Sequence, residues 1–194
     1  MGTEMACVHN ALIRGFNSIY LQAPCIPSHG QPKYKAKDVR DLLIFTNSLL
    51  FTMNHHHDSE EKGLFPALEK EIGIPGFFDV ASEQHQAFHD GLHVLMKMVK
   101  EQIARPDEWK WDEMKRVLNA FMPALQHHLQ AEIPLLLTME RFEEEGLRRA
   151  WDASVEVAKN GMGMEGMVSV AHVSRFSTVN HASVYGISPH IRLS

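Results

Sequence analysis

The sequence predicts an all-α protein, an antiparallel up-down four-helix bundle with a C-terminal extension. Apolar residues recur at three- and four-residue steps over several long segments, which is the period of one helix face. Histidines and acidic residues also recur four apart on these segments, and that offset places both side chains on one face of a helix. We expect residues 1–159 to form the bundle around a two-metal site, and residues 160–194 to form an extension that is either a cover or a tail.

Length and composition indicate one globular domain. The chain has 194 residues, 44% of them hydrophobic, and a net charge of -5, which argues against nucleic acid as a partner. No apolar run is long enough to span a membrane, and the N-terminus lacks the pattern of a secretory signal. Two cysteines do not make a disulfide framework. We therefore expect a cytoplasmic protein with no membrane or nucleic-acid partner.

Helix bounds follow from the apolar period and its interruptions. We expect helices over residues 3–21, 38–71, 79–104, from 107 or 112 to about 144, and 147–159. Residues 22–37 hold three prolines and a glycine and form a loop. Gly63 and Pro66 predict a kink or a change of pitch just after Glu60. Pro134 predicts a second kink close to Glu132, because proline has no N–H for the helix.

Four segments carry the residues that could bind metal. They are VHNALIRG with His9, HHHDSEEKGLFPALE with His56 and Glu60, EQHQAFHDGL with His85 and His89, and HHLQAE with His128 and Glu132. Five imidazoles and two carboxylates are too many for one ion, which takes about six donors at most, and suit two ions with bridging carboxylates. A nitrogen and oxygen set without thiolate favours iron, with manganese as the alternative.

These four motifs, in this order, resemble the hemerythrin HHE cation-binding family over about residues 5–140. The resemblance implies an antiparallel four-helix bundle around a non-haem di-iron centre that handles dioxygen. Carried onto the matching positions, it implies five histidines as terminal ligands and two glutamates as bridges. These residues are His9, His56, His85, His89, His128, Glu60 and Glu132. The fourth motif departs from the family pattern, because Ile133 stands where a second acid is expected.

Some neighbouring residues leave alternatives open. His127 is a rival to His128 as the ligand of the fourth helix. Three consecutive histidines cannot all face inward, because neighbours on a helix diverge by about 100°, so we expect His56 inside and one of its two neighbours in solvent. Glu61 is expected to be a solvated acid. His93, Glu83 and His127 are candidates for outer contacts that orient the ligands.

A centre of this kind has two uses. We expect an oxidase or oxygenase that acts on a small organic molecule with dioxygen and an electron donor. The long proline-rich loop, the prolines of the fourth helix and the C-terminal segment are places where a bundle can open a pocket. The alternative is a reversible dioxygen carrier or an oxygen or redox sensor, since no further acid or base is clearly aimed at the centre.

Overall fold

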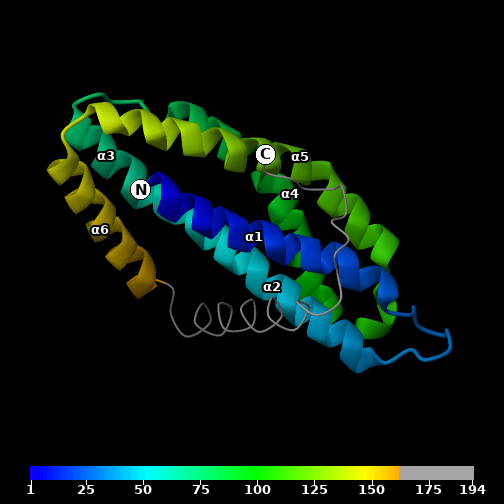
Figure 1. Ribbon diagram of the computed structural model, residues 1–194. Helices are drawn as coiled ribbons and strands as arrows, with labels where there is room; N and C mark the ends of the chain where they lie inside the picture. Colours follow the sequence, from blue (N-terminus) through cyan, green and yellow to red (C-terminus); the bar gives the residue numbers. More distant parts are fainter. Residues whose placement is uncertain (162–194) are drawn as a thin grey trace.

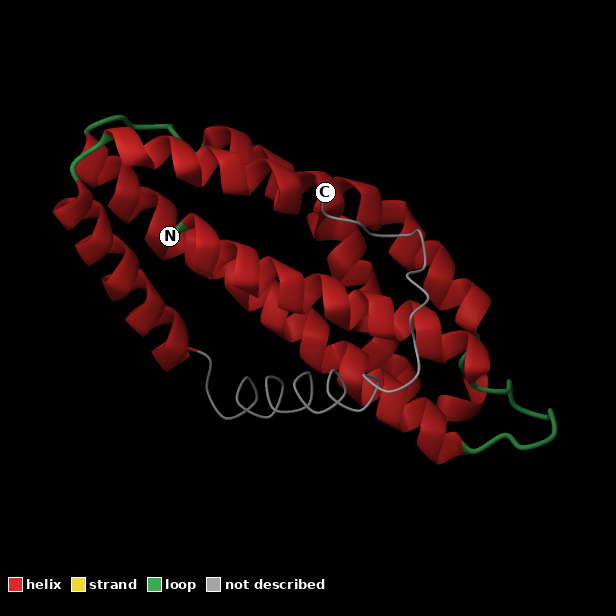
Figure 2. Ribbon diagram, viewed as in Figure 1, coloured by secondary structure: helices red, strands yellow, loops and turns green. Residues whose placement is uncertain are grey.

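Four long helices dominate the computed structural model, which describes residues 1–161. They are α1 (Gly2–Gln22), α2 (Ala36–Ser59), α4 (Asp79–Ala104) and α5 (Trp111–Leu137). Two shorter α-helices, α3 (Phe65–Ile72) and α6 (Glu144–Gly161), complete the fold. The described part of the chain contains no strand, and loops are short except between α1 and α2 (Figure 2). The expected all-α class is confirmed, and the bounds of α4 coincide with the predicted segment 79–104.

The long helices enclose a common core. α1 packs against α2 and α5, and α4 packs against the same two helices from the other side (Figure 1). Their apolar faces form a large buried group, the central cluster, which includes Leu12, Met53, Phe88, Leu125 and Leu129. A second group, the end cluster, lies where α3 and α6 join the bundle and includes Met5, Leu64, Ala81, Leu136 and Trp151. The arrangement is consistent with a hemerythrin-like helical fold.

A polar layer separates the two apolar clusters. α1 passes from Met5 in the end cluster, through the buried His9, to Leu12 in the central cluster. α2 and the π turn that follows it pass the other way, from Met53 in the central cluster to Leu64 in the end cluster. A polar side chain between these layers is cut off from water on both sides, so it needs a partner inside the protein.

The helix that begins as α2 changes its pitch where the sequence predicted. Residues Glu60–Leu64 form a π-helical turn, after which α3 begins at Phe65. The N–H of Phe65 bonds the carbonyl of Glu60, five residues back, and Pro66 has no N–H with which to continue the α-helical pattern. Such turns are frequent at functional sites, and this one begins at a candidate ligand.

The C-terminal end of α5 differs from the prediction. The helix was expected to run to about residue 144, but it ends at Leu137, and a 3₁₀ turn, Thr138–Arg141, follows. The hydroxyl of Thr138 donates to the carbonyl of Leu135 at 2.6 Å, which satisfies a carbonyl that a longer helix would have bonded. The chain then turns back as α6, which packs on α3, the π turn and α2.

Two other expectations concern the ends of the molecule. The predicted extension, residues 160–194, lies outside the described residues from 162 onward. The predicted loop 22–37 is a 3₁₀ turn, Ala23–Cys25, followed by an irregular segment up to Lys35.

Within residues 1–161, none of the helices combines the length and the apolar character needed to cross a membrane.

Candidate metal centre

Seven side chains with nitrogen or oxygen donors meet in the polar layer. They are His9 from α1, His56 and His57 from α2, Glu60 from the start of the π turn, His85 from α4, and His128 and Glu132 from α5. We call them the donor cluster. His9 and His128 are 0% exposed, Glu132 is 1% exposed and Glu60 is 2% exposed, so four ionisable groups stand in the interior.

The donor atoms lie at distances suited to a shared cation. Nε2 of His9 is 3.0 Å from Oε2 of Glu132, and Nε2 of His56 is 3.1 Å from Oε1 of Glu60. Nε2 of His85 is 3.6 Å from Oε2 of Glu60. In three sets, all donor atoms lie within 4.8 Å of one another; the sets are His57, Glu60, His85 and His128; His9, His56 and Glu60; and His9, His128 and Glu132. Glu60, His9 and His128 each belong to two of them, so the three sets overlap in one layer.

Most of these atoms have no hydrogen-bond partner within the described residues. The atoms without a hydrogen bond are Nε2 of His9 and His56, both ring nitrogens of His57, and both carboxylate oxygens of Glu60 and Glu132. Of these, only the His9–Glu132 and His56–Glu60 pairs have a short contact between nitrogen and oxygen, at 3.0 and 3.1 Å. Leaving one buried polar group unpaired costs about 1–3 kcal/mol, so this concentration in one layer is expensive for a purely structural core. Metal cations would give every one of these atoms a partner. The donor set therefore fits metal ions.

Three imidazoles are anchored from behind by hydrogen bonds to Nδ1. Nδ1 of His9 donates to the carbonyl oxygen of Leu129 at 3.1 Å, and Nδ1 of His85 donates to Oε1 of Glu61 at 2.8 Å. Nδ1 of His128 lies 3.4 Å from Oε1 of Gln84. A neutral imidazole whose Nδ1 holds the proton presents a lone pair at Nε2, and outer contacts of this kind are typical of metal-bound histidines.

The ring nitrogens of His85 and His128 face each other at the centre of the cluster. Their Nε2 atoms are 3.0 Å apart. The carboxylate of Glu61 places the proton of His85 on Nδ1, so Nε2 of His85 carries a lone pair. In the metal-free protein Nε2 of His128 can donate to this lone pair, and a cation between the two rings would take the place of that contact.

Burial keeps the imidazoles in their metal-binding form. It lowers the pKa of His56 to about 3 and that of His128 to about 2, with neighbouring histidines adding to the effect. The pKa of His57 is also lowered by burial, and that of His85 is lowered by burial against the opposing effect of Glu61. Burial, followed by the charges of Glu132 and Glu61, raises the pKa of Glu60. Nearby cations would offset the repulsion between the Glu60 carboxylate and these two neighbouring carboxylates.

His89 does not join the donor cluster, which differs from the expectation. Its side chain is 45% exposed, and its ring stacks edge-on against His93 with the centroids 4.0 Å apart. The inward position after His85 on α4 belongs to Phe88, three residues on, and Leu92 continues that stripe. His57 supplies the fifth imidazole of the donor cluster instead. Its ring centroid is 4.5 Å from that of His85. The assignment of individual histidines as metal ligands stays a prediction.

The outer contacts also differ from those expected. His93, Glu83 and His127 are exposed, whereas Glu61 and Gln84 are the residues that contact ligand imidazoles. Of the two rivals on the fourth helix, His128 is the one in the donor cluster. The sequence did hold a signal for Glu61, since it directly follows Glu60, and for His57, which stands four residues before Glu61.

Comparison with known proteins agrees with this geometry. The model of a family described as the hemerythrin HHE cation-binding domain matches residues 4–139. The dimeric xanthone biosynthesis cluster protein R11 of Cryptosporiopsis sp. (strain 8999) is 36% identical over 151 residues, 78% of this chain and 54% of that protein. The chain thus spans about half the length of this relative. An uncharacterized protein of Haemophilus influenzae is 26% identical over 131 residues, 67% of this chain and 72% of that protein. No solved structure matches.

Proposed function

Because the chain belongs to the hemerythrin HHE cation-binding domain family, we propose that its donor cluster holds two iron ions and activates dioxygen to oxidise a small organic molecule. The supporting observation is the set of buried, unpaired donor atoms in one layer of the fold. The opposite order of the apolar clusters along α1 and α2 supports an antiparallel, up-and-down bundle around that layer.

The composition of the cluster favours iron. Imidazole and carboxylate donors without thiolate suit iron, with manganese as the alternative. Seven protein donors are fewer than the roughly twelve positions that two six-coordinate ions offer, so an exogenous molecule can reach a metal. When bound, a pair of ferrous ions supplies dioxygen with two electrons.

The residues of this chain would control that chemistry in two ways. The outer contacts of His9, His85 and His128 hold three rings in place, so little reorganisation is needed when charge changes at the centre. The apolar clusters on both sides of the polar layer keep water from the donors, which limits the loss of reactive oxygen species to solvent.

A pocket beside the cluster favours an enzyme over a carrier. It is lined by His56 and Glu60 together with residues of α1 and α6, so an organic molecule could lie next to the donors. The printed name of the relative R11 refers to xanthone biosynthesis, which agrees with a role in the oxidation of organic compounds. As an oxygenase the protein would insert one oxygen atom and release the other as water, with two electrons from a donor and two protons.

A dioxygen carrier or sensor is the second candidate. It is favoured by the enclosure of the donor cluster between two apolar clusters, since dry, apolar surroundings provide no proton donor beside the donor cluster. In that case the pocket beside His56 and Glu60 would have no substrate.

One experiment separates the two candidates. The protein is loaded anaerobically with ferrous iron, the metal per chain is counted, and the visible spectrum is followed after air is admitted. Two irons and a transient band that decays to a ferric resting state support the enzyme. A band that persists in air and bleaches when oxygen is removed supports the carrier, and a chain that holds no iron overturns both. Glu60→Ala should lose metal, whereas His29→Ala, in the exposed loop, should not.

A further inference from the structure

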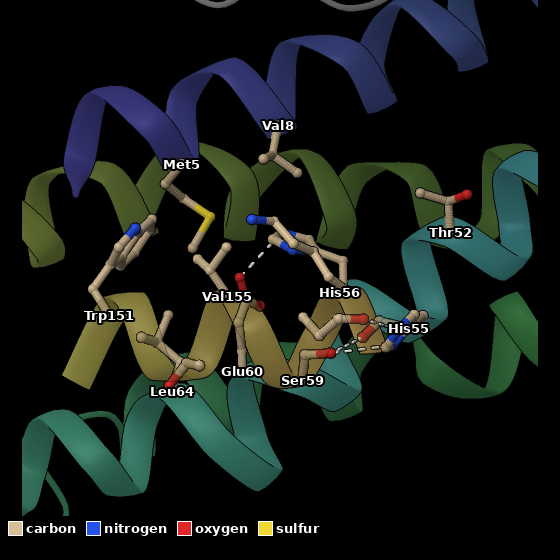
Figure 3. Close-up of a pocket in the computed structure, with 13 residues that line it drawn as sticks. Met5, Val8, Thr52, His55, His56, Ser59, Glu60, Leu64, Trp151 and Val155 are labelled. Carbon is tan, nitrogen blue, oxygen red and sulfur yellow. Dashed lines mark hydrogen bonds and ion pairs between the residues drawn. The ribbon is translucent and has the colours of Figure 1, made fainter. Parts of the chain in front are cut away.

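A pocket of about 240 Å³ lies beside the donor cluster. α1, α2, the π turn and α6 form its walls, and His56 and Glu60 stand at one side of it (Figure 3). An engineered cavity of roughly 150 Å³ in another protein holds a benzene ring. The pocket here is therefore large enough for a molecule of one or two fused rings.

The wall contributed by α6 lies outside the family match. The match ends at residue 139, and α6 begins at Glu144. Trp151 and Val155 of this helix line the pocket opposite Met5 and Val8 of α1. This wall is therefore an addition to the region that the family match covers.

The walls are apolar and suit a flat aromatic molecule. Met5, Leu64, Trp151 and Val155 surround the space (Figure 3). An indole ring favours stacked or edge-on contact with another ring, and a thioether sulfur makes favourable contact with an aromatic edge.

The polar residues of the wall are mostly engaged with the protein itself. Nε2 of His55 lies 2.9 Å from the carbonyl oxygen of Ala158. The hydroxyl of Ser154 donates to the carbonyl of Ala150 at 2.9 Å, and that of Ser59 donates to the carbonyl of His55 at 2.7 Å. Because these groups are bonded within the protein, the wall offers few hydrogen-bonding sites to a strongly polar ligand.

Polar atoms are found at the side that faces the donor cluster. His56 and Glu60 line the pocket at this side, and their donor atoms, 3.1 Å apart, are the ones that would hold a metal ion. A ligand with one polar group would place it there. A hydroxyl suits the position better than a carboxylate, because an anion would lose its hydration among the apolar walls.

We propose that this pocket binds a hydroxylated aromatic compound of one or two fused rings, with its hydroxyl directed toward His56 and Glu60. This inference rests on the proposed function, for which it names the class of substrate. The ring lies between α1 and α6, and α6 determines which ring systems fit.

The test measures binding rather than turnover. The 194-residue chain, loaded anaerobically with ferrous iron, is titrated with 2-naphthol by isothermal calorimetry, and 2-naphthoate is the charged comparison. We expect saturable binding of one 2-naphthol per chain, at least about tenfold tighter than 2-naphthoate, since each tenfold step is about 1.4 kcal/mol. Absence of saturable binding, or tighter binding of the anion, would overturn the proposal.

Two substitutions of the same kind locate the binding. Val155→Trp fills the pocket and should weaken 2-naphthol binding at least about tenfold. Val157→Trp is the matched control, because Val157 lies on the same helix and is 68% exposed, and it should bind as the wild type does. Val8→Trp fills the pocket from α1 at a position that is 41% exposed, so it tests the site even if Val155→Trp does not fold. Unchanged binding in folded Val155→Trp and Val8→Trp would overturn the assignment.

Metal content, measured on the same samples, separates this inference from the proposed function. A protein with two irons that reacts with dioxygen but does not bind 2-naphthol overturns the pocket assignment and leaves the proposed function standing. A protein that binds 2-naphthol in a Val155-dependent manner without holding iron supports the pocket and overturns the proposed function.

Discussion

Glu61 forms the shortest hydrogen bond to a ligand imidazole, with its Oε1 2.8 Å from Nδ1 of His85. A carboxylate can only accept, so this contact places the proton of His85 on Nδ1 and leaves Nε2 free for a cation. The Glu61 side chain is 32% exposed. It therefore links the buried donor cluster to the surface of the protein.

Removal of this contact should weaken metal binding. Glu61→Ala removes the acceptor behind His85, and loss of such outer contacts typically costs 10–100-fold in metal affinity. Glu61→Gln keeps an amide oxygen that can accept the same bond and should restore most of the affinity. Competition with a chelator of known affinity measures the change.

Glu83 provides the matched control, because it is an exposed acid on α4 two residues before His85. Glu83→Ala should bind metal like the wild type. Equal losses in Glu61→Ala and Glu83→Ala would show that only the overall negative charge matters, and the positioning role of Glu61 would be wrong.

A second prediction concerns the fifth imidazole. His57→Ala should lower the metal content, because both of its ring nitrogens are buried and unpaired inside the donor cluster. His89→Ala should leave the metal content unchanged, because His89 is turned to solvent. Elemental analysis after loading and gel filtration compares the two variants. If His89→Ala loses metal and His57→Ala does not, α4 is rotated in the metal-loaded protein and the sequence-based expectation is right.

The sequence was sufficient for the family and for most of the helical segments. The motifs around His9, His56, His85 and His128 predicted the family that the match over residues 4–139 establishes. The bounds of α4 and the change of pitch at Glu60 followed from apolar period and proline chemistry.

The rotation of individual helices was not available from the sequence. Residues four apart differ by about 40° around a helix, so both His85 and His89 were acceptable inward positions until the packing of Phe88 decided between them. The π turn adds a residue to one turn, and no spacing rule for a regular helix predicts that Glu61 meets His85. The contacts of α6 depend on distant parts of the chain in the same way.

Acid should destabilise the metal-free protein. The folded protein lowers the pKa of His56 to about 3 and that of His128 to about 2, from 6.5 for both. At a pH between the folded and the unfolded pKa, the unfolded chain binds more protons than the folded one. The contribution of these histidines to the free energy of unfolding is therefore fully present above pH 6.5 and is lost as the pH falls. The raised pKa of Glu60 acts in the opposite direction above pH 4.5, but it is one group against several histidines.

Urea unfolding at pH 7.5 and 5.5, after removal of metal with a chelator, measures this effect. We expect a loss on the order of 1 kcal/mol for each buried histidine over this interval. His56→Gln should reduce the pH dependence, and His93→Gln, at an exposed position, should not. Greater stability at pH 5.5 than at 7.5 would mean that protonation of Glu60 outweighs the histidines.

The contact between α4 and α5 gives a prediction about the fold itself. A Cβ at Gly91 would lie 2.6 Å from Cβ of Phe121, and that atom cannot move without its backbone. Gly91→Ala should therefore push the two helices apart and lower the free energy of unfolding by about 1–3 kcal/mol. Gly63→Ala is the control, since a Cβ there meets nothing within 4 Å, and it should be neutral or stabilising by up to about 1 kcal/mol. Urea unfolding of both variants decides the matter, and equal stabilities would show that α4 and α5 are less closely packed at Gly91 than described.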